Sequence, residues 1–349
     1  MTATYQLPTS LSPRLGFRSR PVRAHRIHAI IPTFKDWEGL RVTLDSLVRL
    51  KTPPLRITVV NDNEDKAMPE WLRNYFGAMI SYPGNRGPAF ARNAGFGIQK
   101  QKSGEASLHS FMAIANNEPV PDYVKQGYDP RLKYDLMRAR EFTWEHDIDW
   151  FYFTDCGCKH DPDIFLEFEN AWQETGDSCV AISGPVTGEG EGLINKFMTE
   201  QAILHPPKEK FIHDTYIPQT IVTANALISG IAFSFVGGFD ESFKEAAGED
   251  LDLGLRLRKL GMIGWAEKAV VSHRFPEDPA DFYRRFRRYG RGNRQLEMRH
   301  NLPSLRARKY KAELPELQEL ADRQVQAMQA GYDEVIDESV RGKIFISED

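Results

Sequence analysis

The stretch Arg26-Ile27-His28-Ala29-Ile30-Ile31-Pro32 is a short apolar run that ends at a proline, which is typical of a buried β-strand. Residues 36–50 follow it and place Leu40, Leu44, Leu47 and Val48 on one face of a helix. A strand that leads directly into an amphipathic helix is the repeating unit of an α/β domain.

The same alternation continues along the chain. Residues 55–60 and 78–81 predict two more strands, and residues 69–76 and 88–99 predict helices, the second with Pro88 at its start. We therefore predict an α/β fold with a mixed, mostly parallel sheet and flanking helices. Ligands of such sheets bind beyond the carboxyl ends of the strands. No Gly-x-Gly-x-x-Gly follows the first strand, which argues against a dinucleotide-binding dehydrogenase.

A second informative segment is acidic. Gly248-Glu249-Asp250-Leu251-Asp252 stands at the start of an apolar helix and places three carboxylates within four positions. Acidic side chains at a helix N-terminus are favoured by the free backbone N–H groups and the helix dipole, so they could be capping residues. The leucines that follow also place these carboxylates beside buried surface, where the pKa of a proton acceptor can be tuned. Spacing alone leaves both interpretations open.

Five further motifs accompany the acidic block, at residues 30–34, 59–63, 85–95, 153–157 and 270–273. Taken in this order, residues 26–290 resemble a family 2 glycosyltransferase, an inverting enzyme of the Rossmann-like GT-A fold. The resemblance implies transfer of a sugar from a nucleoside-diphosphate donor to a hydroxyl group. The acceptor would be a saccharide, a lipid-linked molecule or a small molecule, as in polysaccharide or glycoconjugate biosynthesis.

The resemblance also implies roles for the acidic residues. Asp250 corresponds to the catalytic base that takes the proton of the acceptor hydroxyl. Glu249 and Asp252 would organise the acceptor and the helix. Asn225, at the end of another apolar run, corresponds to a residue that faces the sugar and the acceptor, although ordinary turn chemistry is the alternative.

A divalent cation is implied in the same way. Asp155 and His273 match positions that the family uses as ligands for Mn²⁺ or Mg²⁺. The family's Asp-x-Asp motif is here Asp155-Cys156-Gly157, so Gly157 replaces the second carboxylate and puts the cation in doubt. A zinc site is an alternative interpretation, and its ligands would be Cys156, Cys158, His160 and Cys179.

The expected donor contacts lie at strand ends and in an arginine-rich run. They are Pro32, Thr33, Asn61, Asp62, Arg86, Arg92, Asp155, Arg288 and Arg291. Asn61 stands where the family has an Asp that contacts the base, so the nucleobase stays open. Residues 284–294 hold six arginines and two glycines, and we expect a mobile segment that closes over diphosphate. A nucleic-acid patch, a lipid-headgroup contact and a solvated helix face are the alternatives.

Length and composition predict one catalytic domain with appendages. The chain has 349 residues and 41% hydrophobic content, enough for a substantial core. We expect a basic extension at 1–24, a GT-A domain at 25–300 with an insertion at 101–149, and a helical appendage at 301–349. The appendage is amphipathic, with a predicted break at Gly331.

Charge and cysteine content narrow the partners and the compartment. A net charge of −4 gives no global attraction to nucleic acid, so we expect no nucleic-acid partner. Three cysteines make no disulfide framework and suit a reducing compartment. We find no apolar run typical of a signal peptide or a membrane span. The expectation is a cytoplasmic protein, with peripheral contact to the inner membrane face if its acceptor is lipid-linked.

Two rival functions share this kind of sheet. A catalytically silent nucleotide-sugar-binding or regulatory protein is suggested by Gly157 and Asn61, while the intact Glu249-Asp250 pair argues for an enzyme. A sugar-nucleotide pyrophosphorylase would need a glycine-rich, arginine-bearing loop after the first strand, where this chain has Pro32-Thr33-Phe34-Lys35.

Overall fold

The computed structural model describes residues 17–63, 68–75, 78–81, 84–97, 148–206, 208–210 and 216–335. Its strands are β1 (Ile27–Thr33), β2 (Arg56–Asn61), β3 (Ala78–Ser81), β4 (Trp150–Thr154), β5 (Cys158–His160), β6 (Cys179–Ser183), β7 (Val186–Gly188), β8 (Lys208–Lys210), β9 (Tyr216–Pro218), β10 (Asn225–Ser229), β11 (Met262–Trp265) and β12 (Val271–His273). Its helices are α1 (Trp37–Val48), α2 (Pro88–Phe96), α6 (Ile164–Thr175), α7 (Leu193–Glu200), α8 (Gly230–Phe235), α9 (Glu249–Leu257), α10 (Pro279–His300) and α11 (Gln318–Glu334), with 3₁₀ turns η1 (Ala24–Arg26), η2 (Glu70–Asn74) and η5 (Pro315–Leu317).

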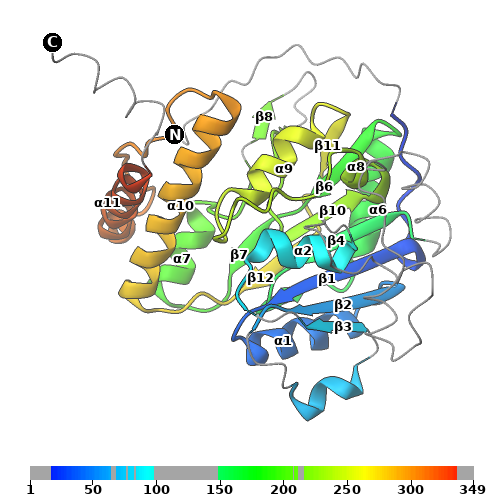
Figure 1. Ribbon diagram of the computed structural model, residues 1–349. Helices are drawn as coiled ribbons and strands as arrows, with labels where there is room; N and C mark the ends of the chain where they lie inside the picture. The colour runs from blue at the N-terminus through cyan, green and yellow to red at the C-terminus, as the bar shows by residue number, and fades with distance from the viewer. Residues whose placement is uncertain are drawn as a thin grey trace, which may run out of the picture.

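A seven-stranded sheet forms the centre of the molecule, in the order β11-β6-β10-β4-β1-β2-β3 (Figure 1). Strands β3, β2, β1 and β4 are parallel, and β11 is parallel to β6. Strand β10 runs antiparallel to both β4 and β6, its two neighbours. This arrangement confirms the predicted α/β class with a mixed, mostly parallel sheet.

Helices cover both faces of the sheet because its strands carry apolar side chains in both directions. In β1, Ala29 and Ile31 point to the face covered by α1 and α6. Ile30, between them, points to the opposite face, which α2, α8 and α9 cover. A strand buried on both faces has a continuous apolar run rather than an alternating pattern, as residues 26–31 have.

The predicted elements of the first hundred residues are confirmed with small shifts at their ends. The segment at 69–76 is an exception, because it forms the short 3₁₀ turn η2. The predicted insertion at 101–149 lies outside the described residues, apart from Ile148 and Asp149. Asp149 is buried and forms ion pairs with Arg20 and Arg26, so residues just before β1 pack against the start of β4.

A small three-stranded sheet, β5-β12-β7, lies beside the main sheet. Strand β12 pairs antiparallel with β5 and parallel with β7, and this pairing sets His273 opposite Cys158 and Gly188. The last residue of β12 is therefore held close to the loop that follows β4.

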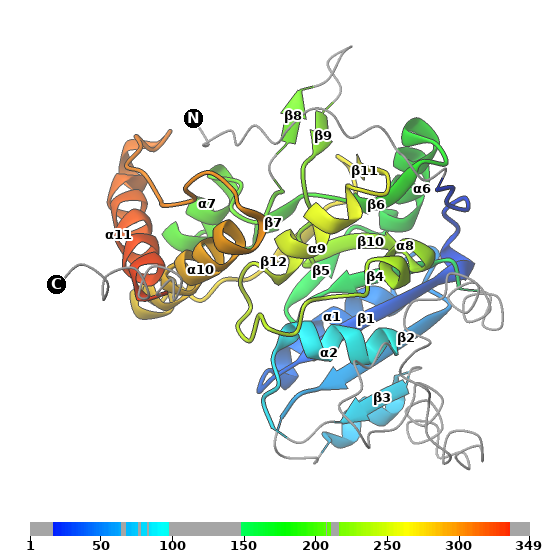
Figure 2. The ribbon, with the colours of Figure 1, turned by 45° about the horizontal axis from the view of Figure 1, so that its top comes forward.

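Helices α10 and α11 lie side by side at one flank of the molecule (Figure 2). They share an apolar cluster with α7 that includes Phe197, Phe286 and Ala321. The predicted break at Gly331 is wrong, because α11 continues through it. An added Cβ at Gly331 would lie 1.8 Å from the carbonyl oxygen of Arg287, so glycine is needed there for close contact between the two helices.

The helices in the described part of the chain do not combine the length and apolar character that a membrane crossing requires.

Candidate active site

The site is built around the first turn of α9. Gly248 precedes this helix with a φ of +89°, a left-handed conformation that favours glycine. An added Cβ at Gly248 would lie 3.1 Å from the ring of Phe243 and 3.2 Å from the carbonyl oxygen of Gly292. The sharp entry turns the chain so that Glu249 and Asp250 stand at the carboxyl edge of the sheet.

Arg92 joins the two halves of the site. From α2, its guanidinium donates to Glu249 Oε1 and to Asp155 Oδ1, each at 2.8 Å. Both Arg92 and Glu249 are almost fully buried, whereas Asp155 is about one-third exposed. One buried cation therefore holds together the end of β4 and the start of α9. Glu249 is bound to an arginine rather than to free backbone amides, so simple capping does not account for it.

Burial raises the pKa of two carboxyl groups in this cluster. Burial and the neighbouring charge of Asp250 raise the pKa of Glu249 to about 7, against the lowering effect of Arg92. Burial also raises the pKa of Asp250. Burial lowers the pKa of Arg92, but the charges of Asp155 and Glu249 outweigh it and leave that pKa above its ordinary value.

Besides Asp155, Asp250 is the member of the cluster that solvent reaches. Its side chain is partly exposed, and its carboxylate accepts from the backbone N–H groups of Thr223 at 3.3 Å and Leu251 at 2.8 Å. These two amides fix the direction of the carboxylate and leave lone pairs for an acceptor hydroxyl. Glu249 Oε2, in contrast, is buried without a hydrogen-bond partner among the described residues.

The residues proposed for a divalent cation supply only part of a ligand set. His273 Nε2 lies 3.1 Å from the carbonyl oxygen of Cys156. Since a carbonyl only accepts, Nε2 carries the hydrogen, and the nitrogen left to ligate a cation is Nδ1, which is buried without a hydrogen-bond partner among the described residues. Gly157 has a φ of +82°, and a Cβ added there would lie 3.5 Å from His273 Nε2. A carboxylate side chain at this position would therefore stand beside His273, and glycine does not supply one. The described residues hold no group of three His, Cys, Asp or Glu side chains suited to a metal ion.

The alternative zinc site does not form either. Cys158 and Cys179 are buried in the apolar core, and their thiols donate to the backbone carbonyl oxygens of Ala224 at 3.9 Å and Ala181 at 3.2 Å. His160 is buried with one ring nitrogen against Thr154 Oγ1 and the other against Ser46 Oγ. These residues are part of the packing under β5.

The donor-side residues from the first strands mostly shape the loops that surround the site. Asp62 is buried, and its carboxylate accepts from the backbone N–H groups of Arg86 and Gly87 at 3.0 and 2.8 Å, which fixes the entry to α2. Asn61 is fully buried and accepts from the backbone N–H of Asn63.

Three further residues of this group lie at the edge of the site. Thr33 is buried at the end of β1, and the carbonyl oxygen of Pro32 accepts from the thiol of Cys156 at 3.4 Å. The Arg86 guanidinium stacks on the ring of Phe90 at 3.5 Å.

The structure places Asp252 and Asn225 in the scaffold, contrary to their expected catalytic and acceptor roles. Asp252 is fully buried and binds Arg256 at 2.6 and 2.9 Å and His300 at 2.8 Å. Asn225 is also fully buried, and its amide is occupied by Tyr152 and by two backbone carbonyls. Neither side chain has an oxygen free for substrate.

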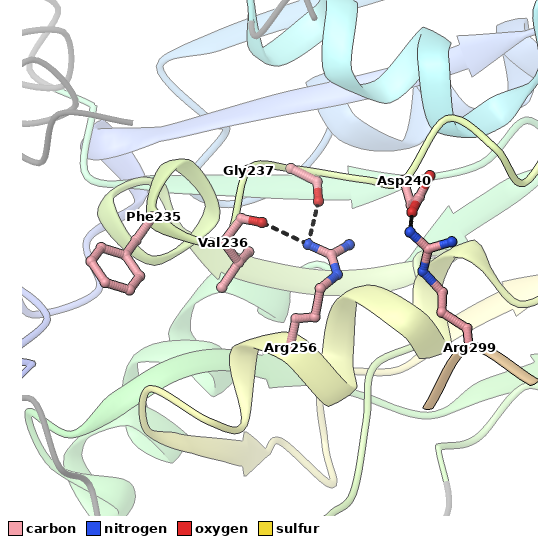
Figure 3. A pocket seen from close by; sticks show the side chains of 7 residues that line it. Phe235, Val236, Gly237, Asp240, Arg256 and Arg299 are labelled. Atoms are coloured by element: carbon pink, nitrogen blue, oxygen red, sulfur yellow. Dashed lines mark hydrogen bonds and ion pairs between the residues drawn. The ribbon is translucent and has the colours of Figure 1, made fainter. Parts of the chain in front are cut away.

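A second polar cluster lines a pocket of about 220 Å³ formed by residues 235–238 and 240, Arg256 of α9 and Arg299 of α10 (Figure 3), and Asp252 is bound to its Arg256. Arg256 donates there to the carbonyl oxygens of Val236 and Gly238, and Arg299 pairs with Asp240. The guanidinium of Arg256 also binds Asp252, so its donors are used within the protein. This cluster anchors α9 to the end of α10.

The arginine-rich run is not a mobile segment, because it lies within the continuous helix α10. Arg291 is occupied by Glu245 and Glu334, and Arg288 Nε donates to the carbonyl oxygen of Ala246 at 3.1 Å. The structure therefore sets both arginines against the loop before α9 rather than against Asp155.

Arg285 was not singled out by sequence reasoning, and the structure places it closer to the chemistry. Its guanidinium lies 5.0 Å from the ring of Phe275, which packs against His273 at 4.6 Å. Burial lowers the pKa of His273, Asp155 raises it, and the charge of Arg285 lowers it further. Arg285 has no ion-pair partner within the described ranges. In the sequence, only the helical periodicity of residues 284–294, which decides which face of the helix each arginine is on, could have distinguished Arg285 from its neighbours.

Comparison with known proteins identifies the class. Residues 28–100 match the model of glycosyl transferase family 2, and residues 150–316 match that of glycosyl transferase family group 2. The molecule is a glycosyltransferase, and its sheet with the reversed strand β10 is the GT-A fold. The chain belongs to glycosyltransferase family 2.

Solved structures of similar fold include two glycosyltransferases. One is the mannosyltransferase PcManGT from Pyrobaculum calidifontis in complex with GDP-Man and Mn²⁺, with 11% sequence identity, coverage of 96% of this chain and 80% of that chain, and a TM-score of 0.48. The other is S. aureus TarS 1-349 in complex with UDP-GlcNAc, with 14% identity, coverage of 93% and 76%, and a TM-score of 0.41. No curated protein sequence matches the chain.

Proposed function

We propose that this chain is an inverting glycosyltransferase that moves a sugar from a nucleoside-diphosphate donor to a hydroxyl of a saccharide, lipid-linked or small-molecule acceptor. The observation that supports this most is the carboxylate of Asp250, which is partly exposed, held by two backbone amides and raised in pKa beside a buried ion-paired cluster. This is the environment of a general base that works near neutral pH.

The transfer is a single displacement. The acceptor oxygen donates its hydrogen bond to Asp250 and attacks the anomeric carbon from the face opposite the diphosphate. The acceptor proton passes to Asp250 as the new C–O bond forms, and the old bond to the diphosphate oxygen breaks with its electron pair. The anomeric configuration is therefore inverted.

Two arginines support this reaction from opposite sides. Arg92 offsets part of the negative charge of Asp155 and Glu249, so that the cluster repels an anionic donor less. Arg285 is the cation we assign to the leaving diphosphate, because it lies beside His273 and has no carboxylate partner within the described ranges. We route no step through a metal ion, since Asp155 and His273 supply only part of a ligand set among the described residues.

The test begins with a thermal-shift screen of UDP-, GDP- and dTDP-sugars, because a ligand of the native state raises its apparent stability. With the donor identified, Asp250→Asn should lower kcat by about 10²- to 10⁴-fold and leave donor affinity largely unchanged. Asp281→Asn, on the exposed first turn of α10, is the matched control and should retain activity. Retained turnover in Asp250→Asn, or a product with retained anomeric configuration by NMR, would contradict the proposal.

A further inference from the structure

The loop of residues 240–248, which delivers Asp250 to the site, lies along helix α10. Arg299 near the end of α10 pairs with Asp240. Farther along the loop, the carbonyl oxygen of Ala247 would lie 2.7 Å from a Cβ added at Gly292, so loop and helix are in close backbone contact. The position of the loop is thus set by α10.

Arg291 is the strongest polar contact between this loop and the helix. Its Nε and Nη2 each donate to a different oxygen of Glu245, both at 2.6 Å, in a bidentate pair. Glu245 lies only three residues before Gly248, where α9 begins its sharp entry turn. Bidentate arginine–carboxylate pairs fix orientation as well as distance.

The third donor of Arg291 reaches the C-terminal helix. Nη1 donates to Glu334 Oε2 at 2.8 Å, and Glu334 also pairs with Arg287. Hydrogen bonds to Glu245, the largest effect, and to Glu334 raise the pKa of Arg291. Helix α11 cannot slide along α10, because the carbonyl oxygens of Met328 and Arg287 pack directly against Gly290 and Gly331.

We infer that Arg291 is a positioning residue for the catalytic base, and that Glu334 of the C-terminal helix holds Arg291 in place. The chain of contacts runs from Glu334 through Arg291 to Glu245 and from there to the start of α9. This inference rests on the proposed function of Asp250 for its kinetic consequence, but the contact chain itself can be tested without activity.

The expected signature is a large effect on rate with a small effect on stability. Exposed ion pairs add little to stability, so loss of either pair should change local loop opening by about twofold to fivefold. A displaced base loses rate steeply, since about 1 Å of misplacement can cost about 10²-fold. We therefore expect kcat to fall about tenfold with the donor KM within about twofold of wild type.

The chain offers a matched control one residue away. Asp333 forms a bidentate pair with Arg306 at 2.6 and 2.7 Å, with exposure similar to that of the Glu334 contacts, but Arg306 does not contact the loop. Glu334→Gln and Asp333→Asn each remove one such carboxylate charge from the same helix end. Their melting temperatures should agree closely, whereas only Glu334→Gln and Arg291→Gln should lower kcat.

Two measurements complete the test. Hydrogen exchange of the backbone amides of residues 241–250 should accelerate in Glu334→Gln and not in Asp333→Asn. In a double-mutant cycle, Arg291→Gln and Glu245→Gln together should be no slower than either alone, because they break one contact chain.

The inference is overturned if kcat of Arg291→Gln stays within twofold of wild type, if the two substitutions in the cycle are additive, or if loop exchange is the same in both helix variants. A wild-type protein that transfers no sugar overturns the proposed function, and the exchange experiment then decides the positioning role independently.

Discussion

Replacing Glu249 by glutamine tests the electrostatics of the site through protein stability. The substitution keeps the size of the side chain and its Oε1, which accepts from Arg92 at 2.8 Å. It removes the ionisable oxygen Oε2, which is buried without a hydrogen-bond partner among the described residues. Glutamine therefore mimics the protonated state of the carboxyl group.

The sign of the effect follows from the raised pKa. The folded protein binds the Glu249 proton up to a pH of about 7, whereas the unfolded chain releases it near 4.5. Because the folded state holds more protons between these values, the free energy of unfolding falls as the pH rises through this window. The shift corresponds to about 3 kcal/mol, fully lost above pH 7. Glu249→Gln has no such loss, so its advantage over wild type should grow by about 3 kcal/mol from pH 4.5 to pH 8.

The assay is urea denaturation of both proteins at pH 4.5, 6, 7 and 8. Glu319→Gln is the control, because Glu319 lies on the exposed face of α11 and its substitution should leave the pH dependence as in wild type. A difference between wild type and Glu249→Gln that does not change with pH, or that grows toward low pH, would refute the electrostatic account of the cluster.

Three further predictions concern other parts of the structure. Gly331→Ala should destabilise the protein by about 1–3 kcal/mol in urea denaturation, because the new methyl group would collide with the Arg287 carbonyl oxygen, and an unchanged midpoint would argue against the close helix contact. Arg285→Ala should weaken binding of the nucleotide-sugar donor by about 10- to 100-fold in calorimetry, and Arg284→Ala, which removes a charge already paired on the outer face of α10, should not. Gly157→Asp should make the Mn²⁺-induced thermal shift larger than in wild type, since it restores a second carboxylate at a left-handed position that Asp tolerates better than most residues, and equal shifts would count against the ligand-set argument.

Local sequence pattern was enough to predict β1, β2 and β3, but not the reversed direction of β10. The continuous apolar run of β1 reflects burial on both faces, and the helix after it shows the spacing of Leu40, Leu44 and Leu47 because only one stripe is buried. Val48, predicted on the same stripe, is 45% exposed because the helix ends there. Such patterns reflect which side chains are buried, so they predict helices and strands better than they predict contacts between particular side chains.

Side-chain contacts across the site could not be predicted from local sequence. The catalytic role of Asp250 is implied by the family resemblance and stays a proposal, although its place at the start of a helix was predicted. The scaffold role of Asp252 was not predicted, because its partner His300 lies 48 residues away, and no local pattern indicates that their side chains meet. For the same reason Asn225 was expected to face the acceptor, whereas Tyr152 and two carbonyls occupy its amide.

Glycines gave the most misleading signal. In α10, Gly290 and Gly292 suggested mobility, yet each allows a backbone from another element to approach the helix. The freedom of glycine to move and its lack of a Cβ are indistinguishable in sequence, and tertiary packing decides which of the two a protein uses.

The reversed direction of β10 has a consequence for how the proposed active site could change in evolution. Asn225 pairs with Thr154, so the segment that enters β10 meets the segments that leave the parallel strands, and it brings the amide of Thr223 to Asp250. The proposed active site is thereby built from two kinds of junction, one upstream and one downstream of a strand. A length change in the approach to β10 would move the amide that holds the proposed base Asp250 and leave the ends of β1, β2 and β4 as they are, which offers a route to new acceptors for the proposed reaction.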